Sequence, residues 1–164
     1  MDSTQARTIA DFLLADFQNE TKTTLGVLGA VPADKLDYSP DAKSKNALGL
    51  LTHLVLADVW FLNCVSGGAF VPPSGKESEA GINTPADAIA RYQETIPAAL
   101  DRVRAMTDDQ LAAPIDFFGM MQAPAVNFLS MAIRHCVHHR GQLSAYLRAM
   151  GGKVPGIYGP SGDM

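Results

Sequence analysis

Histidines carry the clearest chemical signal in this sequence, which contains four of them. Successive residues of an α-helix turn by about 100°, so His135 and His139 would lie about 40° apart on one helical face and could bind one metal ion. His53, on a second helix, would supply a third ligand. Three imidazoles leave coordination positions open, which is typical of catalytic rather than structural zinc sites. A lone histidine is more often a hydrogen-bonded core residue, so the prediction depends on the three converging.

Side chains on the same two helical faces would line a pocket around this ion. By helical angle, the His135 face also carries Phe128, Gln142 and Tyr146. The His53 face also carries Trp60. His138 points about 60° away from His135 and stays outside the ligand set. Core packing is the alternative for the aromatic residues. We predict substrate contacts at Trp60, Phe128 and Gln142, and catalytic roles for His138 and Tyr146.

Four long helices would position these residues, and the spacing of apolar residues predicts them over 4–30, from behind Ser44 to Gly67, over 84–106 and over 124–151. Ser44 is the predicted N-cap of the second helix, and Gly151 the left-handed residue that ends the fourth. Helices of about 20 to 27 residues would each span roughly 30 to 40 Å. Matched helices of this kind indicate an all-α four-helix bundle.

The segments between these helices differ in length. Residues 67–83 are rich in Gly, Pro and Ser and are long enough to cross a bundle from end to end, which permits a parallel pair of helices. Thr107 and Gln110 form a capping box that predicts one short extra helix. Residues 114–123 are predicted to form an irregular or short extended stretch.

Composition limits the classes of protein that this chain can belong to. With 164 residues, 47% of them hydrophobic and 18% charged, it fits one folded domain over 1–164. A net charge of -4 without a basic run argues against nucleic acid and anionic membranes as partners. The most apolar stretch, 47–65, is interrupted by polar residues, and the first residues do not resemble a secretory signal. We therefore predict a cytoplasmic protein whose Cys64 and Cys136 are reduced and buried.

Two motifs in the sequence resemble those of a known family. Residues 135–143 read HCVHHRGQL and are followed by Tyr146-Leu147-Arg148 and Gly151, a pattern similar to the fourth-helix signature of the DinB-like (YfiT-like) proteins. Residues 49–54 read GLLTHL, with Trp60 further on, and resemble the second-helix histidine motif of that family. The turn with Asp34, Leu36, Tyr38 and Pro40 is also similar to the family pattern.

This resemblance implies a four-helix bundle with up-down-down-up topology and a long crossover between the second and third long helices. It also implies a divalent metal ion, zinc or nickel, held by His53, His135 and His139, and a homodimer. Characterised members are mostly transferases or isomerases that use a low-molecular-weight thiol. Many others are described as metal-dependent hydrolases with no known substrate.

We therefore predict a metal-dependent transferase that joins a low-molecular-weight thiol, as co-substrate, to a small electrophilic molecule. The metal would stabilise the thiolate as the nucleophile. The alternative is a hydrolase that uses a metal-bound water, whose pKa zinc can lower to about 7. Hydrolysis ranks second because no Asp or Glu falls on either histidine face, with Asp58 about 140° from His53. A non-catalytic, stress-associated metal-binding bundle is the third possibility.

Overall fold

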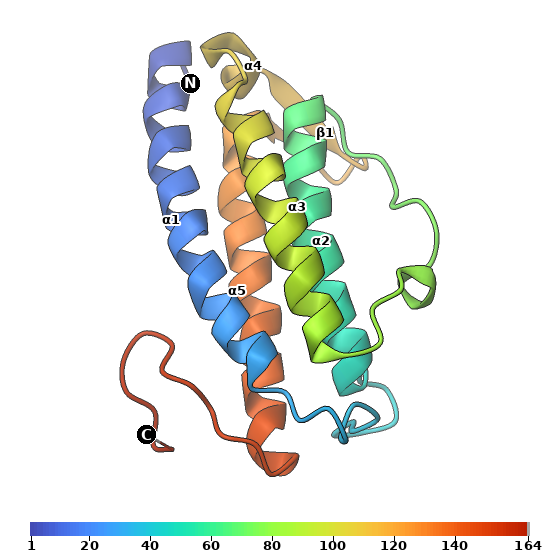
Figure 1. Cartoon of the computed structure of the whole chain (residues 1–164). Coiled ribbons are helices and arrows are strands. Elements are labelled where there is room, and N and C mark those ends of the chain that lie inside the picture. Colours follow the sequence, from blue (N-terminus) through green and yellow to red (C-terminus); the bar gives the residue numbers. More distant parts are fainter. Residues whose placement is uncertain (164) are drawn as a thin grey trace.

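Four long helices dominate the computed structural model, which describes residues 1–163 (Figure 1). They are α1 (Ser3–Gly29), α2 (Ala47–Gly67), α3 (Pro85–Arg104) and α5 (Ala125–Ala149). The shorter elements are the 3-10 helix η1 (Glu77–Glu79), helix α4 (Asp108–Ala112) and the strands β1 (Pro114–Phe117) and β2 (Met121–Pro124). The two strands pair in an antiparallel hairpin, which is the short extended stretch that the sequence predicts. The predicted all-α four-helix bundle is confirmed.

Helix α2 begins later than the sequence predicts, and Ser44 does not cap it. The cap is Asn46, whose side chain accepts a hydrogen bond from the backbone N–H of Gly49 at 2.9 Å. Ser44 is unavailable because its hydroxyl donates to Asp41 at 2.7 Å in the preceding loop. At the other end the prediction holds, since Gly68 ends α2 in the left-handed conformation with φ 72°. Glycine reaches this conformation at low cost because it has no Cβ.

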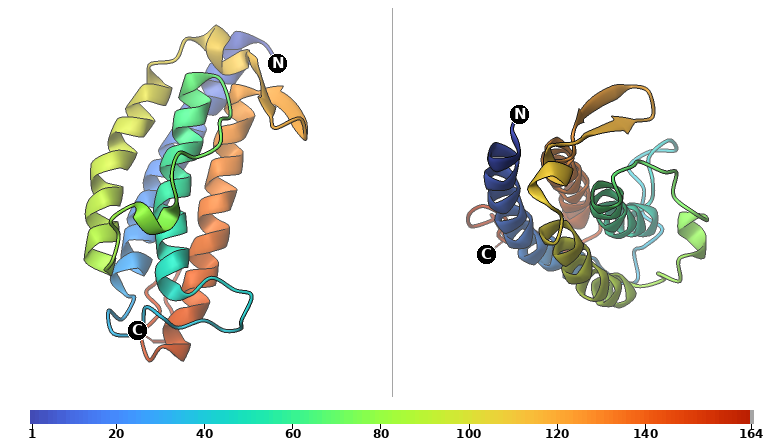
Figure 2. Two further views of the ribbon diagram at one scale, coloured as in Figure 1. Left: turned by 90° about the vertical axis from the view of Figure 1, so that its right-hand side faces the viewer. Right: turned by 90° about the horizontal axis from the view of Figure 1, so that it is seen from above.

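The long helices follow the predicted up-down-down-up topology. In Figure 1 α1 and α5 run downward while α2 and α3 run upward. Helix α2 packs against α5 and α3, and α1 packs against the same two helices, so the order around the bundle axis is α1, α3, α2 and α5. Parallel α2 and α3 require a connection that returns the full length of the bundle. Residues 68–84, called the crossover segment below, make this return along the outside of α2 and include η1 (Figure 2).

The core is apolar, and α2 is its most buried helix. Eleven of its residues are buried, including Leu51, Leu54 and Leu62, each with no exposed surface. By length and composition alone, α2 could also cross a membrane. Its apolar side chains instead pack against α3 and α5, as expected for the central helix of a bundle.

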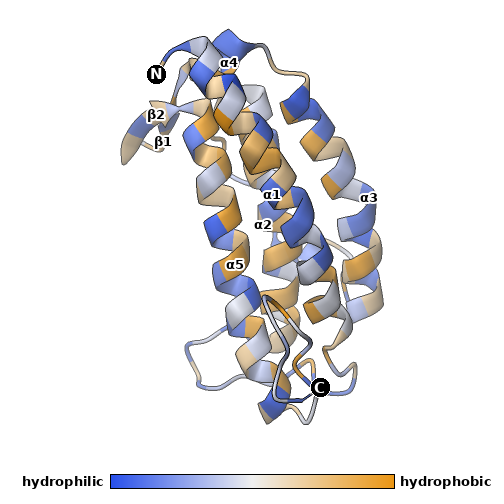
Figure 3. Ribbon diagram, turned by 90° about the vertical axis from the view of Figure 1, so that its left-hand side faces the viewer, coloured by the Kyte–Doolittle hydropathy of each residue, from blue (hydrophilic) through white to orange (hydrophobic). Residues whose placement is uncertain are grey.

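A buried polar cluster joins all four long helices and the C-terminal segment. Tyr92 of α3 donates a hydrogen bond to Asp58 of α2 at 2.7 Å, and Thr24 of α1 lies 3.3 Å from the sulfur of Cys136 on α5. The guanidinium of Arg140 forms an ion pair with the carboxylate of Glu20. It also donates a hydrogen bond to the hydroxyl of Tyr158 at 2.6 Å. The segment that carries Tyr158 follows Gly151, which is left-handed as predicted (φ 80°), and folds back over the lower end of the bundle (Figure 3).

Candidate metal centre

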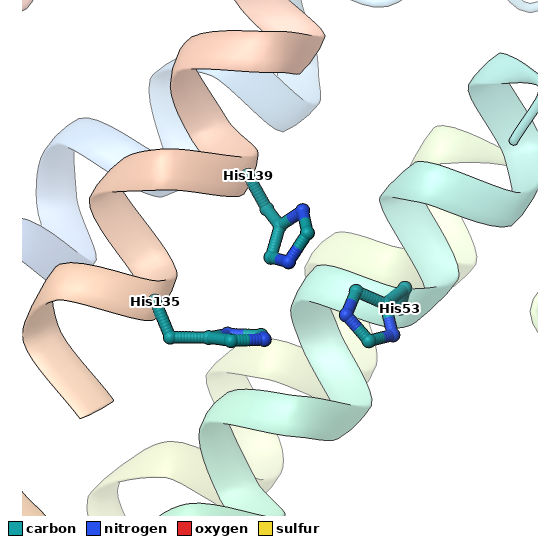
Figure 4. Close-up of side chains that lie close together, drawn as sticks. All are labelled: His53, His135 and His139. Atoms are coloured by element: carbon teal, nitrogen blue, oxygen red, sulfur yellow. The ribbon is translucent and has the colours of Figure 1, made fainter. Parts of the chain in front are cut away.

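Three histidines from two antiparallel helices meet on one side of the bundle. His53 projects from the second turn of α2, and His135 and His139 project from successive turns of α5 toward it (Figure 4). One ring nitrogen of each residue lies within 4.8 Å of one nitrogen of each of the others. The ring centroids are 4.4 to 5.2 Å apart. The predicted i, i+4 pair and the histidine on the facing helix therefore converge as a group that could hold a metal ion.

Two of these rings are oriented by hydrogen bonds to their Nδ1 atoms. Nδ1 of His53 lies 2.6 Å from Oε1 of Glu77 in η1, and Nδ1 of His139 lies 2.7 Å from Oε1 of Gln142, one turn further along α5. A carboxylate and an amide oxygen can only accept, so Nδ1 carries the proton in both rings. In a neutral ring with this tautomer, Nε2 is the unprotonated nitrogen that can bind a metal ion.

His135 has a different environment. Burial, and to a smaller extent the neighbouring imidazoles of His139, His53 and His138, lower its pKa to about 4. The ring is consequently neutral at physiological pH, as a metal ligand must be. Its Nδ1 is buried without a hydrogen-bond partner among the described residues, a costly state for a polar atom.

An aromatic cluster borders the histidines on the side nearer the β-hairpin. The ring of Phe61 lies 5.1 Å from that of His135, and behind it the rings of Trp60, Phe70, Phe117, Phe118 and Phe128 contact one another in series. These rings exclude water from one side of the histidine group. Exclusion of water strengthens electrostatic interactions at the site.

The predicted substrate-binding aromatic residues belong to this cluster. Phe128 has no exposed surface and packs against Phe70 and Phe117, so it supports the cluster from within. The indole N–H of Trp60 donates to the carbonyl of Val71 at 2.8 Å and so holds the crossover segment. Trp60 also lines a hollow of about 400 Å³ between α2 and that segment, which no histidine lines.

The predicted catalytic residues occupy two different positions. His138 is exposed, and its ring centroid lies 4.8 Å from that of His139 at the edge of the site. Tyr146 lies two turns beyond His139 and packs edge-on against Tyr38 at 5.5 Å. Its hydroxyl donates to the backbone carbonyl of Lys45 at 3.2 Å, so its contacts hold the loop before α2.

Sequence reasoning missed two residues at the site, Glu77 and Phe61. No Asp or Glu falls on either histidine face by helical angle, but Glu77 reaches His53 from the crossover segment. Helical angles describe only residues on the same helix, and nothing in a Gly- and Pro-rich segment indicates where it will pass. Phe61 is about 80° from His53 by helical angle. A wider angular limit would have included it.

The residues present fit a divalent metal ion. Three imidazoles offer three nitrogen donors, a set that suits zinc and nickel among other ions. An ion would also give the His135 ring the polar partner that it otherwise lacks. The hydrogen bonds from Glu77 and Gln142 match the outer contacts that metal-bound histidines usually make.

The fold and the site together define a helical bundle with up-down-down-up topology and a three-histidine group that could hold a metal ion. The DinB family model matches residues 3–163, and the chain belongs to the DinB family. The resemblance seen in the histidine motifs is thereby confirmed.

Relatives in two Bacillus species share this fold. The chain is 29% identical over 154 residues to "Uncharacterized protein YrdA" of Bacillus subtilis (strain 168), covering 92% of this chain and 89% of that protein. It is 26% identical over 142 residues to "Uncharacterized protein YjoA" of the same strain, covering 85% and 89%. The crystal structure of YjoA superposes with a TM-score of 0.71 at 22% identity, over 91% of this chain and 99% of that one. A DinB-like protein from Bacillus cereus ATCC 10987 gives 0.73 at 24% identity, over 89% and 95%.

Proposed function

We propose that the three histidines bind a divalent ion, zinc or nickel, and that the protein is a metal-dependent transferase joining a low-molecular-weight thiol to a small electrophilic molecule. The observation that carries this proposal is the convergence of three imidazoles on one point at a partly exposed edge of the bundle. Three protein ligands leave coordination positions for a substrate atom. The bundle has its own apolar core, so a metal ion is not required as a structural support.

The bound ion, His138 and Gln142 would each have a part in this reaction. When bound, the ion would lower the pKa of the thiol and hold its sulfur as a thiolate. Exposed His138, beside His139, is positioned to accept the proton that the thiol releases. The amide of Gln142 faces solvent next to His139 and can contact a polar group of the substrate. The sulfur then forms a bond to the electrophilic carbon, and the leaving group departs with the electron pair of the broken bond.

A hydrolase remains the alternative, and Glu77 is the observation that favours it. Its carboxylate reaches the site from the crossover segment, although no Asp or Glu lies on either histidine face. Both of its oxygens are engaged, however, with Oε1 2.6 Å from His53 and Oε2 2.6 Å from Lys45. An oxygen held by a lysine is a weak proton acceptor, so we rank hydrolysis second. A non-catalytic metal-binding bundle is the third candidate.

The test compares the zinc- or nickel-loaded protein with the chelator-stripped protein in the presence of a small thiol and an epoxide or halogenated electrophile. Thiol consumption is followed with time, and the conjugate is identified by mass. We expect conjugation that depends on the metal and is lost in the His139→Ala variant. Equal rates with loaded and stripped protein would reject the transferase for those substrates, and release of hydrolysis products instead would favour the alternative.

The remaining predictions concern partners and location. A small molecule is the expected partner, and nucleic acid and membranes are not. A homodimer and a cytoplasmic location stay predictions from the resemblance and from the sequence.

A further inference from the structure

The crossover segment is fastened to α2 beside the histidine group. Glu77 provides the closest link, because its two carboxylate oxygens contact His53 and Lys45 at 2.6 Å each. The indole of Trp60 holds the carbonyl of Val71 at 2.8 Å. The segment therefore meets α2 at the metal ligand and again further along the helix, near the aromatic cluster.

Glu77 is suited to orient His53 rather than to replace it as a ligand. Its Oε1 accepts a hydrogen bond from Nδ1 of His53. The other ring nitrogen, Nε2, is then left for the group that His53 forms with the other two histidines. Its Oε2 is held by the ammonium group of Lys45, one residue before the cap of α2. The carboxylate is thus fixed from two sides, and neither oxygen is free to bind an ion.

The charge on Glu77 is secured by the same contacts. Partial burial alone would raise its pKa, but the hydrogen bonds from Lys45 and His53 outweigh burial and hold the pKa below its ordinary value. The neighbouring Glu79, by contrast, is exposed, and its ion pair is with Lys76 at 3.9 Å on the surface of the same short helix. The two glutamates of η1 therefore differ in their contacts, since Glu77 is held at the histidine group and Glu79 lies on the surface.

We propose that Glu77 is a positioning residue of the metal centre, which fixes the ring of His53 and thereby couples the crossover segment to the bound ion. This inference rests on the proposed metal site. Carboxylates behind metal-bound histidines raise the basicity of the ligand and set its orientation, and their loss typically weakens metal affinity about 10- to 100-fold. Because linkage is reciprocal, an ion that binds better when Glu77 is docked must also hold the crossover segment more firmly in place.

The experiment measures zinc affinity of the full chain by competition with a chromophoric chelator. Glu77→Ala should weaken affinity about 10- to 100-fold. Glu77→Gln should fall between this variant and the wild type, because its amide oxygen can still accept the Nδ1 proton. Glu79→Gln, the matched control on the same helix, should bind as the wild type does. Lys45→Met tests the second anchor and should weaken binding less than Glu77→Ala.

Hydrogen exchange of residues 69–82, with and without zinc, provides the second readout. In the wild type zinc should slow exchange in this segment, and in Glu77→Ala it should not. If Glu77 only fastened the segment, exchange would rise equally with and without zinc and affinity would not change. Wild-type affinity in Glu77→Ala, with zinc protection retained, would overturn the inference. Failure of the metal site itself would look different, since the wild type would then bind no zinc or His139→Ala would bind it equally well.

Discussion

Individual side chains at the centre owe their chemistry to their immediate surroundings. His135 is neutral because it is buried among other imidazoles, and His53 and His139 have defined tautomers because Glu77 and Gln142 accept their Nδ1 protons. Residue types and helical angles predict the three histidines, since both properties are local to one helix. They do not predict Glu77, whose position depends on the path of a segment without periodicity.

The two cysteines should be inert in the folded protein. Burial raises the pKa of both the Cys136 and Cys64 thiols, and only 1% and 4% of these residues, respectively, is exposed. A thiol reacts as the thiolate, so the native protein should react negligibly with an aromatic disulfide reagent. Both of the chain's cysteines should react after denaturation. Rapid labelling of the native protein would contradict this description and would also interfere with assays of thiol consumption.

At the scale of elements, the start of a helix depends on which nearby side chain is free to cap its first backbone N–H groups. The sequence analysis predicts Ser44 as the N-cap of α2, but the cap in the structure is Asn46, two residues later. Asn46 takes the role because Asp41 binds the hydroxyl of Ser44 and also accepts the backbone N–H groups of Lys43 and Ser44. This competition lies within one loop, yet it requires the loop conformation to be known.

Removing the true cap should therefore destabilise the protein while removing the predicted one should not. Asn46→Ala leaves the N–H of Gly49 without its acceptor and should lower the free energy of unfolding by about 1 kcal/mol. Ser44→Ala removes only an exposed contact with Asp41 and should cost much less. Urea denaturation of both variants checks the difference. Equal losses would show that Asn46 does not cap α2 in solution.

At the scale of the whole molecule, the polar cluster at the centre of the bundle is the least expected feature. Apolar periodicity predicts the four helices and their packing, and the length of residues 67–83 permits the parallel pair that is observed. It does not predict that Asp58 would be fully buried against Tyr92. In sequence, Asp58 is simply a charged interruption of an apolar helix, and its partners come from other helices.

Asp58 should make stability depend on pH. Burial raises its pKa to about 7, although hydrogen bonds from Tyr92 and Cys136 and the charge of Arg140 oppose the shift. In the unfolded chain an aspartate has a pKa near 3.9. The folded state therefore holds a proton that the unfolded state has lost, and the stability of the wild type falls as pH rises from about 4 to about 7.

The Asp58→Asn variant lacks this titration. Its free energy of unfolding, relative to the wild type, should rise by about 2 kcal/mol between about pH 5 and about pH 8. Measurements in a chelating buffer remove the contribution of bound metal, and Asp37→Asn, at an exposed position, controls for the loss of one negative charge. A difference between Asp58→Asn and wild type that stays constant over this range would contradict the raised pKa.

The central claim, that three histidines form one metal site, is tested most directly by calorimetric titration of the chelator-stripped protein with zinc. The wild type should bind one ion per chain, and His53→Ala, His135→Ala and His139→Ala should each weaken binding by more than about 100-fold, beyond the usual effect of losing an outer contact. His138→Ala, one residue from a ligand but outside the group, should bind as the wild type does. Undiminished zinc binding by His139→Ala would contradict the account.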